Sequence, residues 1–435
     1  MKRTNDLGSD PIIRLVLRLA VPTMLAQLVS VLYSIVDRIY IGAGVGDLGL
    51  AGVGVCGPIV TFLTSFGSLV GLGGSPNMAM RMGAGKKKEA EQFMSSGFLM
   101  LVVISLVLTV ALLLSKDYLL MWFGASEATF PYADTYLTIY AAGTFFALMA
   151  VGMNSFLICQ GFSGLGMLTV VLGAALNIAL DPVFVLPWGF NMGAEGAGLA
   201  TCISNCFAFI YFLVYLWIKR GKSCVNISPR SFKLRRNVVL GVCTVGIPAA
   251  IQNLLNVIGS TVLNNLAAPF GAAVLAAMGI CSKINMVPMY LAMGLAQGVM
   301  PLISYNFASG NTKRMKAAMG FTMKIAESLL IVSAAVMFFG SNPLVRFFIE
   351  DADTVAFGSL FLKGFCLAQP FLAIDFLCVS TFQAVGMGKE SLAVAIMRKP
   401  VLEIPFMYLL NFLFPLYGLP FAQALTEVFM SALAG

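Results

Sequence analysis

The side chains with the clearest potential for chemistry are two aspartates that lie inside long apolar segments. Asn177 and Asp181 are four residues apart, so on a helix they share one face, with side chains about 5–6 Å apart. Asp37 lies in an earlier apolar segment, and Thr201 follows a glycine-rich turn at 189–198. Together these groups offer the hard oxygen ligands that a cation such as Na⁺ requires. Desolvation and mutual repulsion would equally let the two carboxylates share one proton, or each aspartate could simply hydrogen-bond between helices.

The composition of the chain places these residues in a membrane. Of the 435 residues, 59% are hydrophobic and 11% are charged, whereas a soluble protein has about 25% charged residues. So little polar surface excludes a soluble enzyme and a nucleic-acid-binding domain. Histidine is absent, which removes histidine metal sites, haem ligation and histidine general bases. The nine cysteines form no C-x-x-C pair, so we expect small buried residues rather than disulfides or metal ligands.

Twelve segments are long and apolar enough to cross a bilayer as helices, because a span needs about 20 mainly apolar residues. The runs lack the alternation of barrel strands, so the predicted fold class is an all-α polytopic membrane protein. The predicted spans lie at about 15–41, 48–75, 93–115, 132–158, 166–188, 193–218, 240–266, 274–303, 317–339, 356–381, 391–413 and 418–435.

Basic residues divide unequally between the two sets of connections. Most of the 27 Lys and Arg residues, among them Lys389, Arg398 and Lys399, fall in one set, which includes the N-terminus. The opposite set holds only Lys116, Arg346 and Lys363, and two further basic residues, Arg38 and Lys283, fall within spans. This asymmetry predicts cytoplasmic termini in a multi-pass protein of the inner (cytoplasmic) cell membrane. It also explains the net charge of +8 without a nucleic-acid partner.

The two halves of the chain repeat each other weakly but in order. Equivalent residues stand at a nearly constant offset, as in Pro22 and Pro248, Gly85 and Gly310, Gln160 and Gln383, and Pro182 and Pro405. Six spans per half is an even number, so both repeats would run through the membrane in the same direction. We therefore predict an N-terminal six-helix lobe with the cation site at 1–218, a basic cytoplasmic linker at 219–237, and a C-terminal six-helix lobe at 238–435.

Six acidic residues lie within predicted spans, where each charge costs at least about 2.5–3.5 kcal/mol. We expect most of them to face the protein interior or a cavity; they are Asp37, Asp181, Glu327, Asp375, Glu403 and Glu427. The basic loop at 83–87 lacks the spacing of a phosphate-binding loop. A literal G-x-G-x-x-G at 52–57 lies in an apolar span with no preceding strand, which indicates close helix packing. We expect no cofactor, and without an ATPase domain in this chain transport would run on an ion gradient.

Several motifs point to one family when they are taken together. They are Pro22 with the stretch VDRIYIG at 36–42, Asn177-x-x-x-Asp181-Pro182, the stretch GAEGAGLAT at 193–201, and the basic loops at 85–88 and 310–313. In this combination the chain resembles the multidrug and toxic compound extrusion (MATE) transporters, and most of all their bacterial drug-exporting branches. The resemblance covers essentially the whole chain.

The resemblance implies a V-shaped pair of six-helix lobes that exports cationic or amphipathic compounds in exchange for Na⁺ or H⁺. The family's N-terminal-lobe cation site falls on Asp37, Asn177, Asp181 and Thr201, and its helix-one proline, which is tied to bending of that helix, falls on Pro22. The C-terminal lobe fits less fully, because the stretch 253–265 has no acid where some members carry a glutamate. Asp375 and Glu403 could instead attract a cationic substrate, or Asp375 could pair with Lys283.

These observations predict an ion-coupled antiporter that works by alternating access, not an enzyme. One alternative is an exporter or flippase of lipid-linked sugars from a related branch, which should show a broader basic cavity than Arg38 and Lys283 provide. A second is a polytopic membrane transferase, which would normally need paired aspartates for Mg²⁺ or a histidine base. The sequence does not distinguish Na⁺ from H⁺, because both would use the same oxygens.

Overall fold

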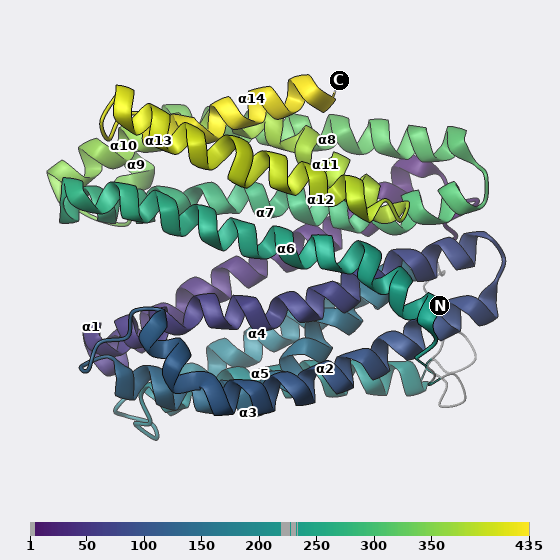
Figure 1. Ribbon diagram of the computed structural model, residues 1–435, viewed down its shortest axis with the longest axis horizontal. Coiled ribbons are helices and arrows are strands. Elements are labelled where there is room, and N and C mark those ends of the chain that lie inside the picture. The colour runs from purple at the N-terminus through teal and green to yellow at the C-terminus, as the bar shows by residue number, and fades with distance from the viewer. Residues whose placement is uncertain (1–4, 219–226, 228–231, 233, 435) are drawn as a thin grey trace.

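The computed structural model describes residues 5–218, 227, 232 and 234–434 of the chain, and within these residues its regular structure is entirely helical (Figure 1). The first half contains α1 (Ile12–Gly83), α2 (Lys87–Trp122), α3 (Phe130–Cys159), α4 (Ser163–Val185) and α5 (Ala194–Ile218). The second half contains α6 (Arg236–Ala267), η2 (Ala268–Phe270), α7 (Ala272–Ala308), α8 (Thr312–Phe339), α9 (Ser341–Arg346), α10 (Ala352–Cys366), α11 (Gln369–Ala384), α12 (Gly388–Ile396), the π-helical turn η3 (Met397–Glu403), α13 (Ile404–Leu413), η4 (Leu419–Phe421) and α14 (Ala422–Ala434). Most of the predicted linker at 219–237 lies outside the described residues.

Helix α1 contains two membrane spans rather than one. Its 72 residues would extend for roughly 110 Å if straight, more than three times the hydrocarbon thickness of a bilayer. The backbone leaves helical geometry at Gly46, where φ is 73° and ψ is −171°. Only glycine adopts that combination at little cost, so the chain reverses there and the predicted spans 15–41 and 48–75 follow each other directly.

Among the described residues, the other helices complete the predicted number of twelve spans. Eight helices are long and apolar enough to cross a membrane, and α10 with α11 makes a ninth span that is bent by 48°. Dividing α1 at Gly46 adds a tenth. The continuous run α12–η3–α13 and the shorter apolar segment from η4 to α14 supply the last two.

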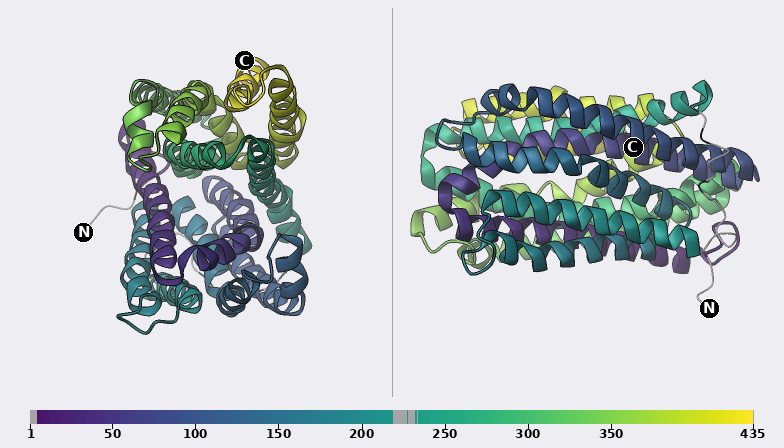
Figure 2. Two further views of the ribbon diagram at one scale, coloured as in Figure 1. Left: turned by 90° about the vertical axis from the view of Figure 1, so that its left-hand side faces the viewer. Right: turned by 90° about the horizontal axis from the view of Figure 1, so that it is seen from below.

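The helices gather into two groups, which correspond to the two halves of the chain (Figure 2, left). Helices α1–α5 form one group and α6–α14 form the other, and α1 packs against both α6 and α7. We call these groups the N-lobe and the C-lobe.

Glycines allow the two lobes to pack closely against each other at one end of the bundle. This is the end that carries the connections at 84–86 and 309–311. A Cβ atom on Gly73 would lie 2.2 Å from the carbonyl oxygen of Val242, and one on Gly246 would lie 2.0 Å from that of Leu69. On the other side of the contact, a Cβ on Gly298 would lie 2.3 Å from the hydroxyl of Thr23. The two backbones therefore touch at positions where no larger residue fits.

Gly73→Ala is therefore expected to weaken the contact between the lobes. The added methyl group meets helical backbone that cannot move aside, and overpacking of this kind costs about 1–3 kcal/mol, which corresponds to a loss of roughly five- to 150-fold in the population of this arrangement. We expect lower thermal stability in detergent and slower transport. The matched control is Gly54→Ala on the same helix, where the added methyl group meets open space. Wild-type stability and transport in Gly73→Ala would contradict the role of this contact.

Candidate functional site

Three of the predicted site residues meet between α4 and α5. The amide nitrogen Nδ2 of Asn177 lies 3.4 Å from Asp181 Oδ1 and 3.5 Å from the hydroxyl oxygen of Thr201. Asn177 and Asp181 are buried on one face of α4, as their four-residue spacing requires. Thr201 donates its hydroxyl to the carbonyl of Ala197, 3.0 Å away, which directs the oxygen lone pairs toward Asn177.

Asp37, which lies on α1, is the fourth residue of this group. Its carboxyl group lies within hydrogen-bonding range of that of Asp181. Asp37 Oδ1, Asp181 Oδ2 and Asn177 Oδ1 are all buried, and none has a hydrogen-bond partner among the described residues. Two facing carboxylates with unpartnered oxygens require a positive charge between them, because an uncompensated buried charge costs several kcal/mol.

The oxygen set fits either a monovalent metal ion or a proton. Two carboxylates, one amide oxygen and one hydroxyl are hard ligands of the type that alkali and alkaline-earth cations take. The described part of the chain contains no cluster of three or more His, Cys, Asp or Glu side chains that could hold a metal ion by themselves, so a metal ion here would also need Asn177 and Thr201. A single proton shared between the two carboxyl groups satisfies the same charge requirement.

Three tyrosines around the aspartates were not predicted from the sequence. Tyr33 of α1 lies within electrostatic range of both Asp37 and Asp181, and Tyr136 of α3 lies within range of Asp37. The rings of Tyr136 and Tyr140 stack at 6.2 Å. Their spacing of four residues marks one helical face, but the same pattern occurs in any packed helix and therefore gives no specific signal.

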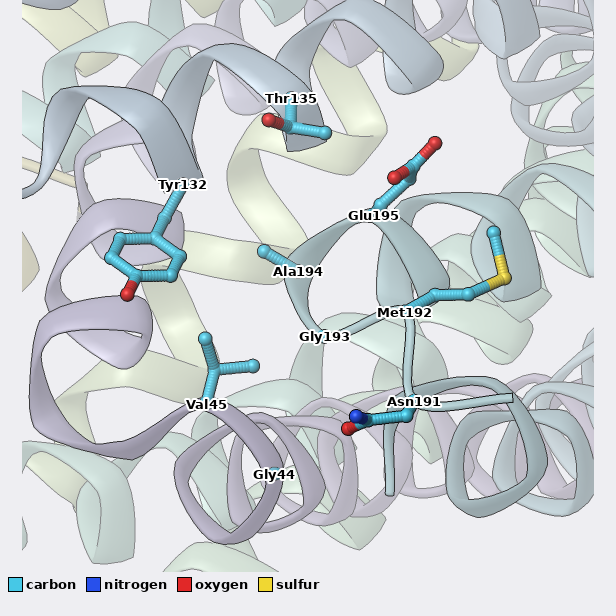
Figure 3. Close-up of a pocket in the computed structure, with 9 residues that line it drawn as sticks. All are labelled: Gly44, Val45, Tyr132, Thr135, Asn191, Met192, Gly193, Ala194 and Glu195. Carbon is cyan, nitrogen blue, oxygen red and sulfur yellow. The ribbon is translucent and has the colours of Figure 1, made fainter. Parts of the chain in front are cut away.

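A pocket of about 310 Å³ is lined by residues of α1, α3, α5 and the connection that precedes α5 (Figure 3). Gly44 of α1, Tyr132 of α3 and Glu195 of α5 line it. Each of these residues stands one to two helical turns along its element from Asp37, Tyr136 and Thr201, respectively. The lining of this pocket does not include Asp37, Asn177, Asp181 or Thr201, so the pocket is distinct from the carboxylate site.

Pro22 has an identifiable structural consequence although α1 keeps helical geometry there. A proline cannot donate to the carbonyl four residues earlier, which is that of Arg18. The freed carbonyl of Arg18 instead accepts a hydrogen bond of 3.1 Å from the hydroxyl of Ser163, the first residue of α4. At the equivalent place in the C-lobe, Pro248 frees the carbonyl of Thr244, and Gly388 packs so closely against that oxygen that a Cβ would not fit. Gly46 is the single residue of α1 with non-helical φ and ψ, so the predicted role of Pro22 in bending this helix stays a prediction.

The predicted carboxylates of the C-lobe, Asp375 and Glu403, are buried in a network of charges. Arg398 is placed between Asp375 and Glu427, with Nη1 3.3 Å from Asp375 Oδ2 and Nη2 2.6 Å from Glu427 Oε1. Lys399 Nζ lies 2.6 Å from Glu403 Oε1. Asp375 therefore pairs with Arg398. The expectation that Asp375 pairs with Lys283 was wrong.

This network corrects the assignment of Arg398 and Lys399 to a cytoplasmic connection. Arg398, Lys399 and Pro400 lie within the predicted span 391–413, and in the structure they form part of the π-helical turn η3 within a continuous helical run. The wider turn accommodates the proline and directs both basic side chains into the C-lobe. The last of the span carboxylates, Glu327, is exposed on α8 and does not join the network.

Two basic side chains face each other from opposite lobes. Arg38 of α1 and Lys283 of α7 lie within electrostatic range of each other. Among the described residues, neither makes a hydrogen bond or an ion pair with an acidic side chain. Arg38 is also within electrostatic range of the Asp37 carboxyl group, so two basic groups and one acidic group lie close together here.

The fold and the site define a polytopic membrane transport protein, with two six-helix lobes and a carboxylate site in the first of them. The chain belongs to the MatE family, whose model matches residues 22–183 and 248–409. The two matched segments begin at Pro22 and Pro248, the first pair in the internal repeat. Family membership makes the protein a MATE transporter and not an enzyme, and confirms the resemblance seen in the sequence.

Known relatives and solved structures are each similar to this chain over nearly its whole length. The multidrug export protein MepA of Staphylococcus haemolyticus is 27% identical over 423 residues, which cover 97% of this chain and 92% of the relative. MepA of Staphylococcus saprophyticus is 28% identical over 411 residues, covering 94% and 89%. A MATE structure in the straight conformation has a TM-score of 0.93 at 25% identity and covers 100% of this chain and 96% of its own. The outward-facing conformation of a multidrug resistance MATE family transporter has a TM-score of 0.94 at 24% identity, covering 100% and 96%. These likenesses confirm the predicted fold class.

Proposed function

We propose that the protein is a secondary active multidrug efflux transporter that exports cationic or amphipathic compounds in exchange for Na⁺ or H⁺. The observation that carries the proposal is the facing pair of Asp37 and Asp181, with buried oxygens that lack partners. Such a pair gains a cation or proton in one state and releases it in another, which is the chemistry that coupling needs. The names of the MepA relatives support the assignment of multidrug export.

Helix α1 connects the carboxylate site to the contact between the lobes. Asp37 lies on the same helix as Gln27, whose amide nitrogen lies 3.2 Å from the side-chain oxygen of Gln297 in the C-lobe. One turn further, the hydroxyl of Thr23 donates to the carbonyl of Gly294 at 2.6 Å. A cation that binds Asp37 and Asp181 would change how α1 packs, and so would favour one arrangement of the lobes through its different affinity for the two states.

We also infer a position in the inner (cytoplasmic) cell membrane with both termini on the cytoplasmic side. The exposed side chains of Lys86, Lys87 and Lys88 follow α1, and other basic connections lie at the same end of the bundle. Removing Arg398 and Lys399 from the cytoplasmic set leaves the asymmetry of basic residues intact, so the positive-inside rule still gives this orientation.

The test of the proposed function imposes the two gradients separately. The purified protein is reconstituted in liposomes with a fluorescent cationic dye, and a Na⁺ gradient at constant pH is compared with a pH gradient in the absence of Na⁺. We expect one gradient to drive dye movement and an ionophore that dissipates it to stop that movement. Failure of both gradients to drive dye would overturn the proposal.

The charge of Lys283 gives a separate prediction about substrates. A positive charge beside the path of a cationic compound opposes its binding by about 1 kcal/mol or more at the dielectric of a partly hydrated site. Lys283→Gln is therefore expected to increase the export of a cationic dye several-fold, while a neutral dye of similar size is exported at the same rate. The matched control is Lys389→Gln, whose side chain is exposed at the far end of the bundle. An equal change for both dyes would show that the charge of Lys283 does not select substrates.

A further inference from the structure

The residues that precede α1 form a turn that is bound to both lobes. We call residues 5–10 the N-terminal strap. Leu7 is buried, and its side chain belongs to the apolar cluster that is built mainly by α1 and α7. Asp6 holds the turn together, because its Oδ1 accepts from the amide of Gly8 at 2.9 Å and its Oδ2 from the hydroxyl of Ser9 at 2.6 Å. The strap therefore has a defined shape although it lies outside the helices.

On the side of the C-lobe, one asparagine and one arginine bind the backbone of the strap. The carbonyl of Leu7 accepts from Asn306 Nδ2 at 3.1 Å and from Arg314 Nε at 3.2 Å. Nη2 of Arg314 donates to the carbonyl of Asp10. Asn306 lies in the last turn of α7 and Arg314 in the first turn of α8. A single guanidinium group therefore holds two carbonyls of the strap, with hydrogen bonds of the stronger, charge-assisted kind.

On the side of the N-lobe, the strap is bound at the connection between α3 and α4. Asn5 Nδ2 donates to the carbonyl of Gly161 at 2.9 Å. The strap also continues directly into α1, which is bound to α4 by the hydrogen bond from Ser163 to the carbonyl of Arg18. Both links attach the strap to the N-lobe, so its hydrogen bonds to α7 and α8 join one lobe to the other.

The strap lies at the end of the bundle where the lobes touch. At this end, a Cβ on Gly83 of α1 would lie 2.2 Å from the carbonyl oxygen of Tyr305 in α7. Asn5 and Leu7, which bind different lobes, are two residues apart, and a fully extended chain covers at most about 7 Å over that separation. If the lobes separate here by more than that reach allows, the strap cannot stay bound to both.

We propose that the N-terminal strap is a latch, which Arg314 fastens to the C-lobe and which must release Arg314 before this end of the protein opens. The inference rests on the proposed transport by alternating access, because only then do the lobes separate at this end in one state. The hydrogen bonds of Arg314 to Leu7 and Asp10 exist in the closed state alone. They therefore shift the equilibrium between the two states toward closure, and Arg314 is a positioning residue that binds neither ion nor substrate.

The test measures the distance between the lobes at this end by double electron–electron resonance. Nitroxide labels are attached through an unnatural amino acid at Lys88 and Lys316, which are exposed near the starts of α2 and α8. We expect Arg314→Gln to raise the ratio of the longer to the shorter distance about ten-fold, since hydrogen bonds from a charged donor are lost. Arg314→Lys should give most of this change, because an ammonium group does not reproduce the planar fork. Lys313→Gln, which changes the exposed neighbour, is the control and should leave the ratio unchanged.

A second variant shows whether Arg314 acts through the strap. Leu7→Gln places a polar side chain in an apolar site and should expel the strap without disturbing any helix, so it should raise the same ratio. Adding Arg314→Gln to Leu7→Gln should then have no further effect. An unchanged ratio in Arg314→Gln, an equal change in Lys313→Gln, or a further rise in the double variant would each overturn the latch.

The measurement needs neither a gradient nor a dye, so it does not depend on whether Asp37 and Asp181 couple transport. A longer distance that is present but insensitive to Arg314 would overturn the latch and leave the proposed function standing. Absence of the longer distance from the wild type and every variant would overturn both, because the lobes would then not separate at this end.

Discussion

Asp37→Asn and Asp181→Asn are each expected to abolish gradient-driven export, with at least a hundred-fold loss of rate and normal accumulation in the membrane. The pair binds a cation or proton through two facing carboxylates, and an amide in place of either one removes the charge on which that binding depends. The fold should tolerate the change, because Asp37 Oδ1 and Asp181 Oδ2 accept no hydrogen bond that would be lost. Removing one of two like charges from a buried site relieves repulsion, so thermal stability should be equal or higher.

The measurement is dye movement in liposomes under whichever gradient drives the wild-type protein. Glu327→Gln is the control, because it also changes a span carboxylate but one that is exposed on α8. Dye binding measured without a gradient should be nearly unchanged in both aspartate variants, which separates loss of coupling from loss of substrate binding. Export at the wild-type rate in either aspartate variant would contradict the proposed coupling site.

The N-lobe site could be located from the sequence because its geometry follows from local spacing. Asn177 and Asp181 share a helical face by their separation alone, and both are polar in an apolar segment where polar groups are costly. Asp37 and Thr201 lie on other helices, and their approach to this face depends on how those helices pack. The resemblance to MATE transporters supplied that information, and the structure places all four residues together.

The C-lobe could be predicted less completely because its arrangement depends on an irregular turn. The predicted span 391–413 contains Arg398, Lys399 and Pro400, yet the count of basic residues assigned Arg398 and Lys399 to a cytoplasmic connection. The π-helical turn η3 changes the direction of both side chains, and nothing in the spacing of the sequence marks it. Glu427 could be predicted as buried, but its partner could not, because the partner had been assigned to the cytoplasm.

Replacing Arg398 by methionine is expected to produce the largest loss of stability of any substitution considered. Methionine keeps the length and apolar packing of the side chain but leaves Asp375 and Glu427 buried without a positive charge. Breaking a buried ion pair in this way costs about 3–5 kcal/mol, so we expect a steep fall in the amount of folded protein and in its unfolding temperature in detergent. Arg346→Met, which changes an exposed arginine, is the control and should behave as the wild type.

The same reasoning predicts that Arg398→Met can be rescued by neutralising its partners. In the combination Arg398→Met/Asp375→Asn/Glu427→Gln no unpaired charge of these three residues remains, and a buried neutral amide costs less free energy than a buried unpaired charge. We therefore expect most of the lost stability to return. A triple variant as unstable as Arg398→Met would show that the guanidinium group stabilises the C-lobe through its packing on Phe376 and not through the charges of Asp375 and Glu427.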